Sequence, residues 1–286
     1  MMEFGKAIRQ LRRNRDWTQK QLADGICSQS LLSRIEKGIE NPSVFVIFHL
    51  CQKLGITLDE LLHKEEFSSP FLKLKTELFS LYRQNDFETI YTLLHKKNFS
   101  LFEAYHETHY YNFFLGVSEL VYKQNEKAAQ IYLSQAENQK GEKLFTTLIK
   151  SYLAKIYAKQ NEAVLTLETL NACLNQLNQA TSHEKQNRLM PNIYHNLCMT
   201  YLFLNQPKQA ILYVNLGIEC CKAQQNTYQL VLLIFRSGQI FMHLGRKKIG
   251  MKRMSAAIDL SEHIDPSLTE KLGYEKQNWR KICEYA

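Results

Sequence analysis

The stretch Thr18–Gly38, TQKQLADGICSQSLLSRIEKG, decides the fold of the first part of the chain. It predicts two short helices joined by a tight turn, at which Gly25 supplies the positive φ that a sharp turn often needs. Ser28 is expected to cap the second helix through its hydroxyl, and Gly38 to end it in a left-handed conformation. This is the helix-turn-helix pattern, in which the second helix enters the major groove of DNA.

The second helix of this pair separates an apolar face from a polar one. Leu32 and Ile35 stand three apart and are expected to face the core. The other positions carry side chains of the types that reach base edges and phosphates. Together with the first residue of the preceding helix, the predicted DNA-contacting set is Gln19, Ser28, Gln29, Ser30, Leu31, Ser33, Arg34 and Lys37. The alternative interpretation is an ordinary helical hairpin with a polar outer face.

Three further helices are predicted around this pair. The first runs from Phe4 to Arg13, and its Arg12 is well placed to pair with Glu36 and tie the helix to the recognition helix. A fourth helix begins after Ser43, and a fifth is expected from Thr57 to Leu62. The sequence therefore predicts an all-α chain with a five-helix helix-turn-helix domain over residues 1–66 and a linker over residues 67–70.

Residues 71–286 predict helix after helix, with few Gly or Pro. Five corners recur, namely YRQNDFETI, YKQNEKAAQI, YAKQNEAVL, FLNQPKQAI and HLGRKKIGM, and they align on Asn85, Asn125, Asn161, Asn205 and Gly245. Asn or Gly there fits the left-handed residue that a helical hairpin needs. The spacing indicates a repeat of tetratricopeptide type, slightly longer than the usual form. Such hairpins stack into a superhelix whose concave inner surface is the expected binding site.

Composition limits the classes of function. The net charge is +8, of which residues 1–53 carry +4, so basicity is useful at the N-terminus and diffuse elsewhere. The N-terminus has no apolar signal core and no apolar run is long enough to span a bilayer, so we expect a cytoplasmic protein. The seven cysteines form no CxxC pair and the nine histidines do not cluster at metal-ligand spacing, so neither a metal site nor a cofactor is expected. No catalytic motif is present, and we expect no enzyme.

Several polar residues are candidates for the concave surface. Asn112 and Asn196 are placed on helices rather than at corners, where an Asn offers a donor and an acceptor to a peptide backbone, although a solvated surface amide is an equally good interpretation of each. Arg236 and Lys155 could meet a peptide carboxylate, but plain surface charge is the favoured interpretation of Lys155.

The motifs TQKQL, ICSQS, SRIE and NPS, followed by the five-hairpin repeat, resemble the PlcR/NprR regulators of Gram-positive bacteria, within the wider group that includes Rgg and PrgX. The resemblance covers the full chain and is most specific in the helix-turn-helix. It implies a homodimeric, cytoplasmic transcription factor that binds a palindromic operator in double-stranded DNA. It also implies that a short, re-imported signalling peptide binds the concave surface. By position it adds Tyr274 to Asn196 and Arg236 as peptide-contacting candidates, and Asn112 completes the set.

Two other functions remain open from the sequence. One keeps DNA binding but replaces the peptide with a protein partner of the repeat domain. The other is an adaptor in which only the repeats act and the N-terminal domain serves dimerisation.

Overall fold

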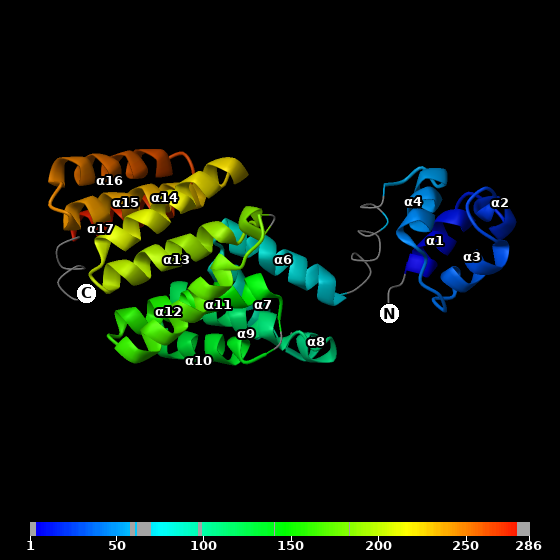
Figure 1. The fold of residues 1–286 in the computed structure, drawn as a ribbon, viewed down its shortest axis with the longest axis horizontal. Coiled ribbons are helices and arrows are strands. Elements are labelled where there is room, and N and C mark those ends of the chain that lie inside the picture. The colour runs from blue at the N-terminus through cyan, green and yellow to red at the C-terminus, as the bar shows by residue number, and fades with distance from the viewer. Residues whose placement is uncertain are drawn as a thin grey trace. The chain divides into compact units, whose positions relative to one another are not determined.

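The computed structural model describes residues 4–57, 61, 70–96, 99–139, 141–182 and 184–278, and every regular element in these ranges is helical (Figure 1). Contacts divide the chain into unit 1, Met1–Ser80, and unit 2, Leu81–Ala286. The division falls within α6 (Pro70–Gln84). Residues 58–60 and 62 of the expected fifth helix and residues 67–69 of the expected linker lie outside the described ranges, so the predicted boundaries of the two domains stay predictions.

Unit 1 contains the predicted helix-turn-helix. Its helices before α6 are α1 (Phe4–Arg13), α2 (Gln19–Ala23), α3 (Gln29–Glu36) and α4 (Val44–Lys53). Their apolar faces meet in one core, made of Ile8, Leu11, Leu22, Ala23, Leu32, Ile35, Leu50, Cys51, Leu54 and Leu61. Fully burying one aliphatic side chain of this kind contributes about 1.5–3 kcal/mol, so this core is what holds four short helices together.

Helix α1 crosses α3 at very close range. A Cβ atom added to Gly5 would lie 1.8 Å from the carbonyl oxygen of Ile35, well inside van der Waals contact. Only glycine therefore fits at this position of α1.

Helix α4 is apolar on more than one face. Leu50 and Cys51 are buried, but Phe45 and Phe48 are exposed. At 100° per residue Phe45 lies almost opposite the midpoint of Leu50 and Cys51 on the helix, and Phe48 lies about 110° from that midpoint, so both rings leave the core side. Their rings pack edge-on against His49 instead.

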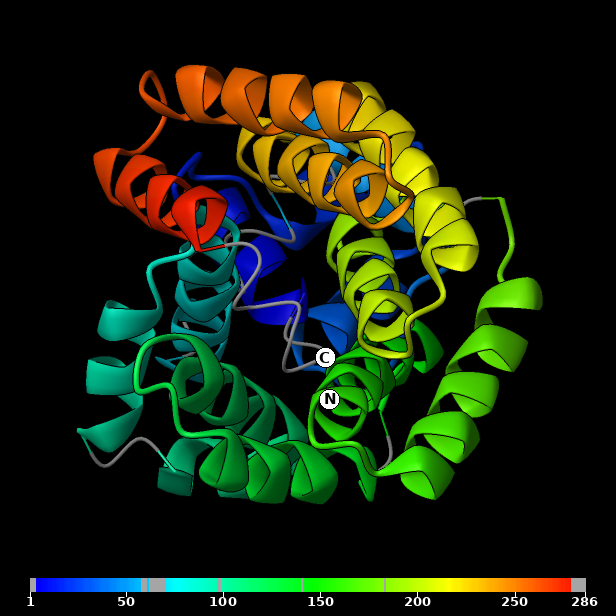
Figure 2. The same cartoon turned by 90° about the vertical axis from the view of Figure 1, so that its left-hand side faces the viewer.

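Unit 2 is a stack of helical hairpins. After α6 its helices are α7 (Phe87–His95), α8 (Phe99–Ala104), α9 (Thr108–Val121), α10 (Glu126–Glu137), α11 (Lys143–Lys159), α12 (Ala163–Asn178), α13 (Met190–Phe203), α14 (Pro207–Gln224), α15 (Thr227–His243), α16 (Lys247–Ser261) and α17 (Pro266–Gln277). Packing pairs α9 with α10, α11 with α12, α13 with α14 and α15 with α16. Figure 2 shows these pairs, green to orange, following one another around a curved path.

The left-handed corners are present at four of the five predicted positions. Asn85, Asn161, Asn205 and Gly245 have φ of 60°, 60°, 54° and 74°. The fifth prediction is wrong by one residue, because Gln124 has φ 54° while Asn125 is the N-cap of α10. The Asn125 side chain accepts a hydrogen bond from the backbone N–H of Ala128 at 3.2 Å, a task that suits Asn as well as a left-handed corner does.

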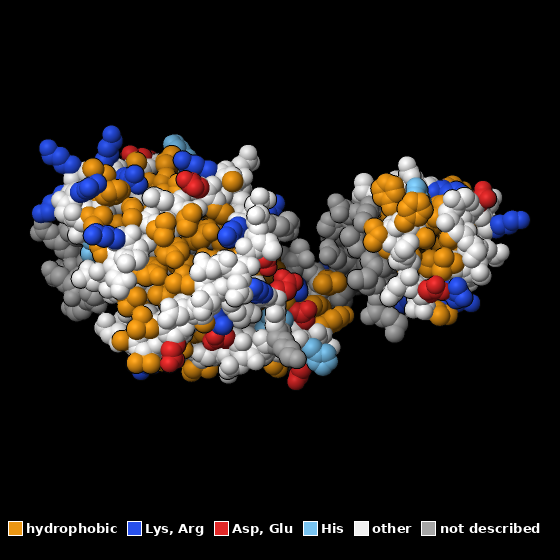
Figure 3. All heavy atoms as spheres, in the orientation of Figure 1, with side chains coloured by type: hydrophobic (Ala, Val, Ile, Leu, Met, Phe, Trp, Pro, Cys, Tyr) orange, Lys and Arg blue, Asp and Glu red, His pale blue; other side chains and the backbone are white. Residues whose placement is uncertain are grey.

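The helices of each hairpin differ in burial. Helices α11, α13 and α15 are buried on several faces, whereas α12, α14 and α16 bury a single row of small and apolar residues. The second set forms the outer layer. Large apolar side chains remain exposed on it, and Figure 3 shows hydrophobic side chains gathered on the face of unit 2 where α14 lies. Exposed members on α12 and α14 are Val164, Leu165, Leu167, Leu212 and Leu216.

Candidate functional site

The recognition helix α3 is started by a side-chain cap. Ser28 accepts a hydrogen bond from the backbone N–H of Leu31 at 3.2 Å, and the preceding turn contains Gly25 with φ 76°. Gly38, with φ 69°, follows the helix. All three features agree with the sequence prediction, and together they fix which face of α3 turns outward.

That outward face is polar. Leu32 and Ile35 are buried beneath it, and Leu31 and Ser33 are half-buried. The exposed members of the predicted DNA-contacting set are Ser28, Gln29, Ser30, Arg34 and Lys37. Arg34 Nε lies 2.7 Å from a carboxylate oxygen of Glu40, with both side chains about half exposed. A base contact that uses Nε of Arg34 therefore requires Arg34 to leave Glu40.

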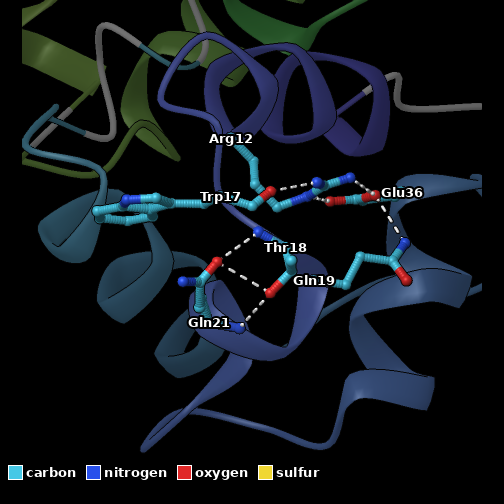
Figure 4. Close-up of polar contacts among 6 residues, drawn as sticks. All are labelled: Arg12, Trp17, Thr18, Gln19, Gln21 and Glu36. Carbon is cyan, nitrogen blue, oxygen red and sulfur yellow. Dashed lines mark hydrogen bonds and ion pairs between the residues drawn. The ribbon is translucent and has the colours of Figure 1, made fainter.

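A buried ion pair ties α1 to α3. Arg12 donates through Nε and one Nη to the two carboxylate oxygens of Glu36, at 2.6 and 2.9 Å, and through its other Nη to the carbonyl of Trp17 at 2.6 Å (Figure 4). Gln19 of α2 donates to the same carboxylate at 2.8 Å. One carboxylate thus links three helices. We call the network of Arg12, Gln19 and Glu36 the frame of α3. Gln19, which was predicted to contact DNA, belongs to this frame.

The protonation of Glu36 follows from these contacts. Burial favours the neutral acid, but the hydrogen bonds from Arg12 and Gln19, followed by the charges of Arg12 and Arg9, outweigh burial and lower the pKa of the carboxyl. Glu36 is therefore an acceptor only, as the geometry of Figure 4 requires. The frame beneath the recognition helix is a satisfied, charge-assisted network.

The second site is a groove of about 580 Å³ inside unit 2. This volume is within the range of small-ligand sites. The inner helices α11, α13 and α15 contribute most of its wall, and α17 and the α6–α7 and α9–α10 corners contribute the rest. Apolar side chains such as Ile156, Met199 and Leu232 alternate along the wall with amides.

The groove floor is unusually polar for its burial. The most deeply buried polar side chains that line it are Asn196, Gln229, Arg236 and Gln239, each with an exposed fraction of 8% or less. Asn196 donates to Ser151 Oγ at 3.0 Å and accepts from Lys155 Nζ at 2.8 Å. Two buried atoms on the floor, His195 Nε2 and Gln229 Oε1, have no hydrogen-bond partner in the described ranges. Buried polar atoms in proteins are usually paired with protein groups or ordered water, so these two atoms can bond to a ligand or to a water molecule in the groove.

Charge in the groove is predominantly positive. Arg236 pairs with Glu275, and Lys159 with Glu126. The half-buried Lys155 and the lysine Lys271 of α17 form no ion pair with a carboxylate of the described residues. Because Lys155 is half-buried and lines the groove, surface charge, which was the favoured interpretation from the sequence, was wrong.

The structure brings together half of the predicted peptide-contacting residues. Asn196 and Arg236 lie in the groove wall. Asn112 is buried on α9 but does not line the groove, and Tyr274 is 67% exposed on α17 and does not line it either. The two latter assignments stay predictions without support from the groove.

Sequence reasoning named Arg236 but missed the other residues of a polar row on α15. Gln229, Arg236, Gln239 and His243 all line the groove and stand at intervals of seven, three and four. This spacing places them on one face of a helix. Polar residues at helical spacing in an otherwise apolar helix were the signal that would have found them.

Neither a cluster that could hold a metal nor a helix that could span a membrane is found in the described part of the chain. No group of three or more metal-ligating side chains occurs in it. None of its helices combines the length and apolarity needed to cross a membrane.

The fold and the two sites define a class: a helix-turn-helix domain joined to a helical-hairpin repeat with a concave groove. Residues 8–61 match the helix-turn-helix family model. A comparison with curated protein sequences gives no match.

Among solved structures, PlcR of Bacillus thuringiensis in complex with the peptide PapR7 and DNA is similar over 95% of this chain and 99% of its own, at 20% identity and a TM-score of 0.73. ComR of S. thermophilus, in complex with DNA and its signalling peptide ComS, is 15% identical over 96% and 98%, with a TM-score of 0.58. The SHP pheromone receptor Rgg2 of Streptococcus dysgalactiae is 18% identical over 98% and 100%, with a TM-score of 0.56. These likenesses establish a shared fold from end to end.

Proposed function

We propose that the chain is a sequence-specific DNA-binding transcriptional regulator, and not an enzyme, that is controlled by a short signalling peptide. The peptide is bound in the groove of unit 2, as part of quorum sensing in the cytoplasm. One observation supports the proposal above all: the same chain combines a recognition helix held in place by the Arg12–Glu36 pair with a groove whose floor is polar. This chain shares its fold with PlcR, ComR and Rgg2. PlcR and ComR have been crystallised with DNA and a peptide.

Binding of DNA as a dimer is supported by the form of the site. Each chain supplies one recognition helix, and a palindromic operator needs two, about 34 Å apart. The exposed apolar side chains of α12 and α14 offer area that a second copy would cover.

Peptide binding is supported by the composition of the groove wall. Amides such as Asn192, Asn196 and Gln229 present donors and acceptors that match a peptide backbone. The apolar side chains between them match peptide side chains. A peptide that spans α11, α13, α15 and α17 would contact several hairpins at once and bias their relative packing.

Selection of random double-stranded DNA by the full chain tests the DNA half of the proposal. We expect enrichment of one palindromic motif, bound by a dimer in analytical ultracentrifugation. Binding should weaken steeply with salt, because phosphate contacts release counterions. A chain that enriches no motif would be an adaptor, and the proposal would be wrong. A motif bound with no peptide effect at any concentration would favour a regulator whose repeats bind a protein.

A further inference from the structure

The groove contains more positive charge than its own carboxylates balance. Its cations are Lys155, Lys159, Arg236 and Lys271, and its carboxylates are Glu126 and Glu275. The two carboxylates are each committed to an arginine or lysine partner. Among the described residues, the ammonium groups of Lys155 and Lys271 are left over. A partly desolvated cation without a counterion is costly, so an anion that enters here gains more than it would at the protein surface.

Lys155 is held in one position rather than free to move. Its Nζ donates to the side-chain oxygen of Asn196 at 2.8 Å and lies 4.6 Å from the centre of the Tyr152 ring. Asn196 is itself fixed by its bond to Ser151. An ammonium group has three donors, so two remain for a ligand. A lysine positioned in this way is a preorganised donor for an anionic group.

Building on the proposed function, we propose that Lys155 and Lys271, with Arg236 beside them, form a carboxylate-binding subsite. The ligand of the groove is therefore a peptide that presents a carboxylate to Lys155. That carboxylate belongs either to an acidic side chain or to the C-terminus of the peptide. Both sources share the same chemistry, and the experiment below separates them.

The charge state of the subsite agrees with this geometry. Burial first, and then the charges of Arg236, Lys271 and Lys159, lower the pKa of Lys155 to about 7. Glu126 of α10 acts in the opposite direction. His195 of α13 is kept neutral, because burial first, and then the charges of Arg236, Lys155 and Lys271, lower its pKa well below the ordinary value. Residues 163–178 of α12, which packs against α11, contribute none of the groove lining.

A bound carboxylate favours the charged lysine and so raises the pKa of Lys155. Binding then takes up a proton. The sign follows from linkage. Peptide affinity is highest below the pKa of Lys155 in the ligand-free groove, about 7, and falls by up to about tenfold per pH unit above it. The fall ends at the pKa of Lys155 in the complex.

The test uses the full chain and two pools of synthetic random peptides, five to eight residues long, one with free C-termini and one amidated. Peptides that co-elute with the protein are identified by mass spectrometry. The test variant is Lys155→Met, which keeps the stem and removes the charge. Lys150→Met is the matched control, because Lys150 is on the same helix and does not line the groove.

We expect the wild type and Lys150→Met to retain peptides that carry a carboxylate. An acidic side chain is the source if Asp or Glu is enriched in both pools, and the C-terminus is the source if only the free-acid pool is retained. Lys155→Met should weaken a retained peptide roughly 10- to 100-fold, the loss of a charge-assisted hydrogen bond. NMR of ¹³C-labelled lysine should show the Lys155 midpoint rising by a pH unit or more on addition of that peptide.

Two failures can be told apart. Peptides retained equally by Lys155→Met, with no acidic preference and no shift of the midpoint, would leave peptide binding in place and overturn the subsite. No retention by any of the three chains would overturn peptide binding itself, and the subsite with it.

Discussion

The recognition helix of unit 1 and the groove of unit 2 use similar polar side chains, but the helix exposes them and the groove buries them. On α3 the polar groups intended for a partner are exposed, while the buried polar groups beneath them, Arg12 and Glu36, are fully paired. In the groove the polar groups are buried around a hollow, and His195 Nε2 and Gln229 Oε1 lack partners in the described ranges. A surface that reads a rigid polymer needs a satisfied frame, whereas a site that encloses its ligand leaves groups for that ligand to satisfy.

The largest effect is expected from breaking the frame of unit 1. Glu36→Ala leaves Arg12 buried without its carboxylate and removes the acceptor of Gln19. The free energy of unfolding of unit 1 should fall by roughly 3–5 kcal/mol, the range for orphaning a buried charge. Urea unfolding followed by the fluorescence of Trp17, in a Trp279→Phe background, measures it.

Glu40→Ala is the matched control, because Glu40 pairs with Arg34 at an exposed position. Its cost should be about 0–1 kcal/mol. The stabilisation by Glu36 should also depend on pH. Since folding lowers its pKa, the contribution is complete above the ordinary pKa of glutamate and is lost as pH falls through the lowered value. Equal costs for the two variants would show that the buried pair contributes no more than a surface pair.

Much of unit 1 was predictable because its signals are local. The bounds of α1, the cap at Ser28 and the start of α4 after Ser43 each depend on residue types a few positions apart. The Arg12–Glu36 contact depends on two fixed positions of the helix-turn-helix pattern. The role of Gln19 was less accessible. Its approach to Glu36 depends on how α2 packs against α3, which no local pattern encodes.

The groove was less predictable because its wall is assembled from helices that are distant in sequence. The corners located the hairpins, but which residue of each helix turns inward depends on how the hairpins stack. That is why Lys155 was taken for surface charge and only Arg236 of the α15 row was named. Asn112 and Tyr274 were named although neither lines the groove. The periodicity of α15 was visible, but its meaning required the partner helices.

A smaller effect is expected from removing the central amide of the groove. Asn196→Ala leaves Ser151 and Lys155 without their shared partner, so peptide affinity should fall by about tenfold or more. Operator binding without peptide and dimerisation should remain. Asn112→Ala is a matched control, an Asn of similar burial outside the groove lining. A full peptide response in Asn196→Ala, or an equal loss in both variants, would place the ligand elsewhere.

On the recognition helix, Arg34→Ala should cost about 1–3 kcal/mol at the selected operator if Arg34 makes a bidentate base contact. Selectivity at one base position should relax at the same time. Glu40→Ala should leave affinity unchanged or raise it slightly, because it frees Arg34 from its exposed partner. Titration of both variants against the operator and a single-base mutant measures the effect. If affinity and selectivity survive in Arg34→Ala, Arg34 does not read a base.

The smallest expected effect concerns the first turn of α3, where capping of the helix can be distinguished from contact with DNA. Ser28→Ala removes the side-chain cap and should lower the free energy of unfolding by about 1 kcal/mol. Ser30, exposed two residues later, is not the residue that caps α3, so Ser30→Ala should change stability by less than about 0.5 kcal/mol.

Ser28→Thr keeps the capping oxygen and should restore most of the stability lost in Ser28→Ala. If Ser28 acts only as a cap, operator affinity should follow stability across the three side chains at this position. If Ser28 also contacts phosphate, as the sequence predicts, Ser28→Ala should lose affinity at every DNA sequence, beyond what its stability explains. Equal stability of Ser28→Ala and Ser30→Ala would show that Gly25 and the core fix the start of α3 without the serine hydroxyl.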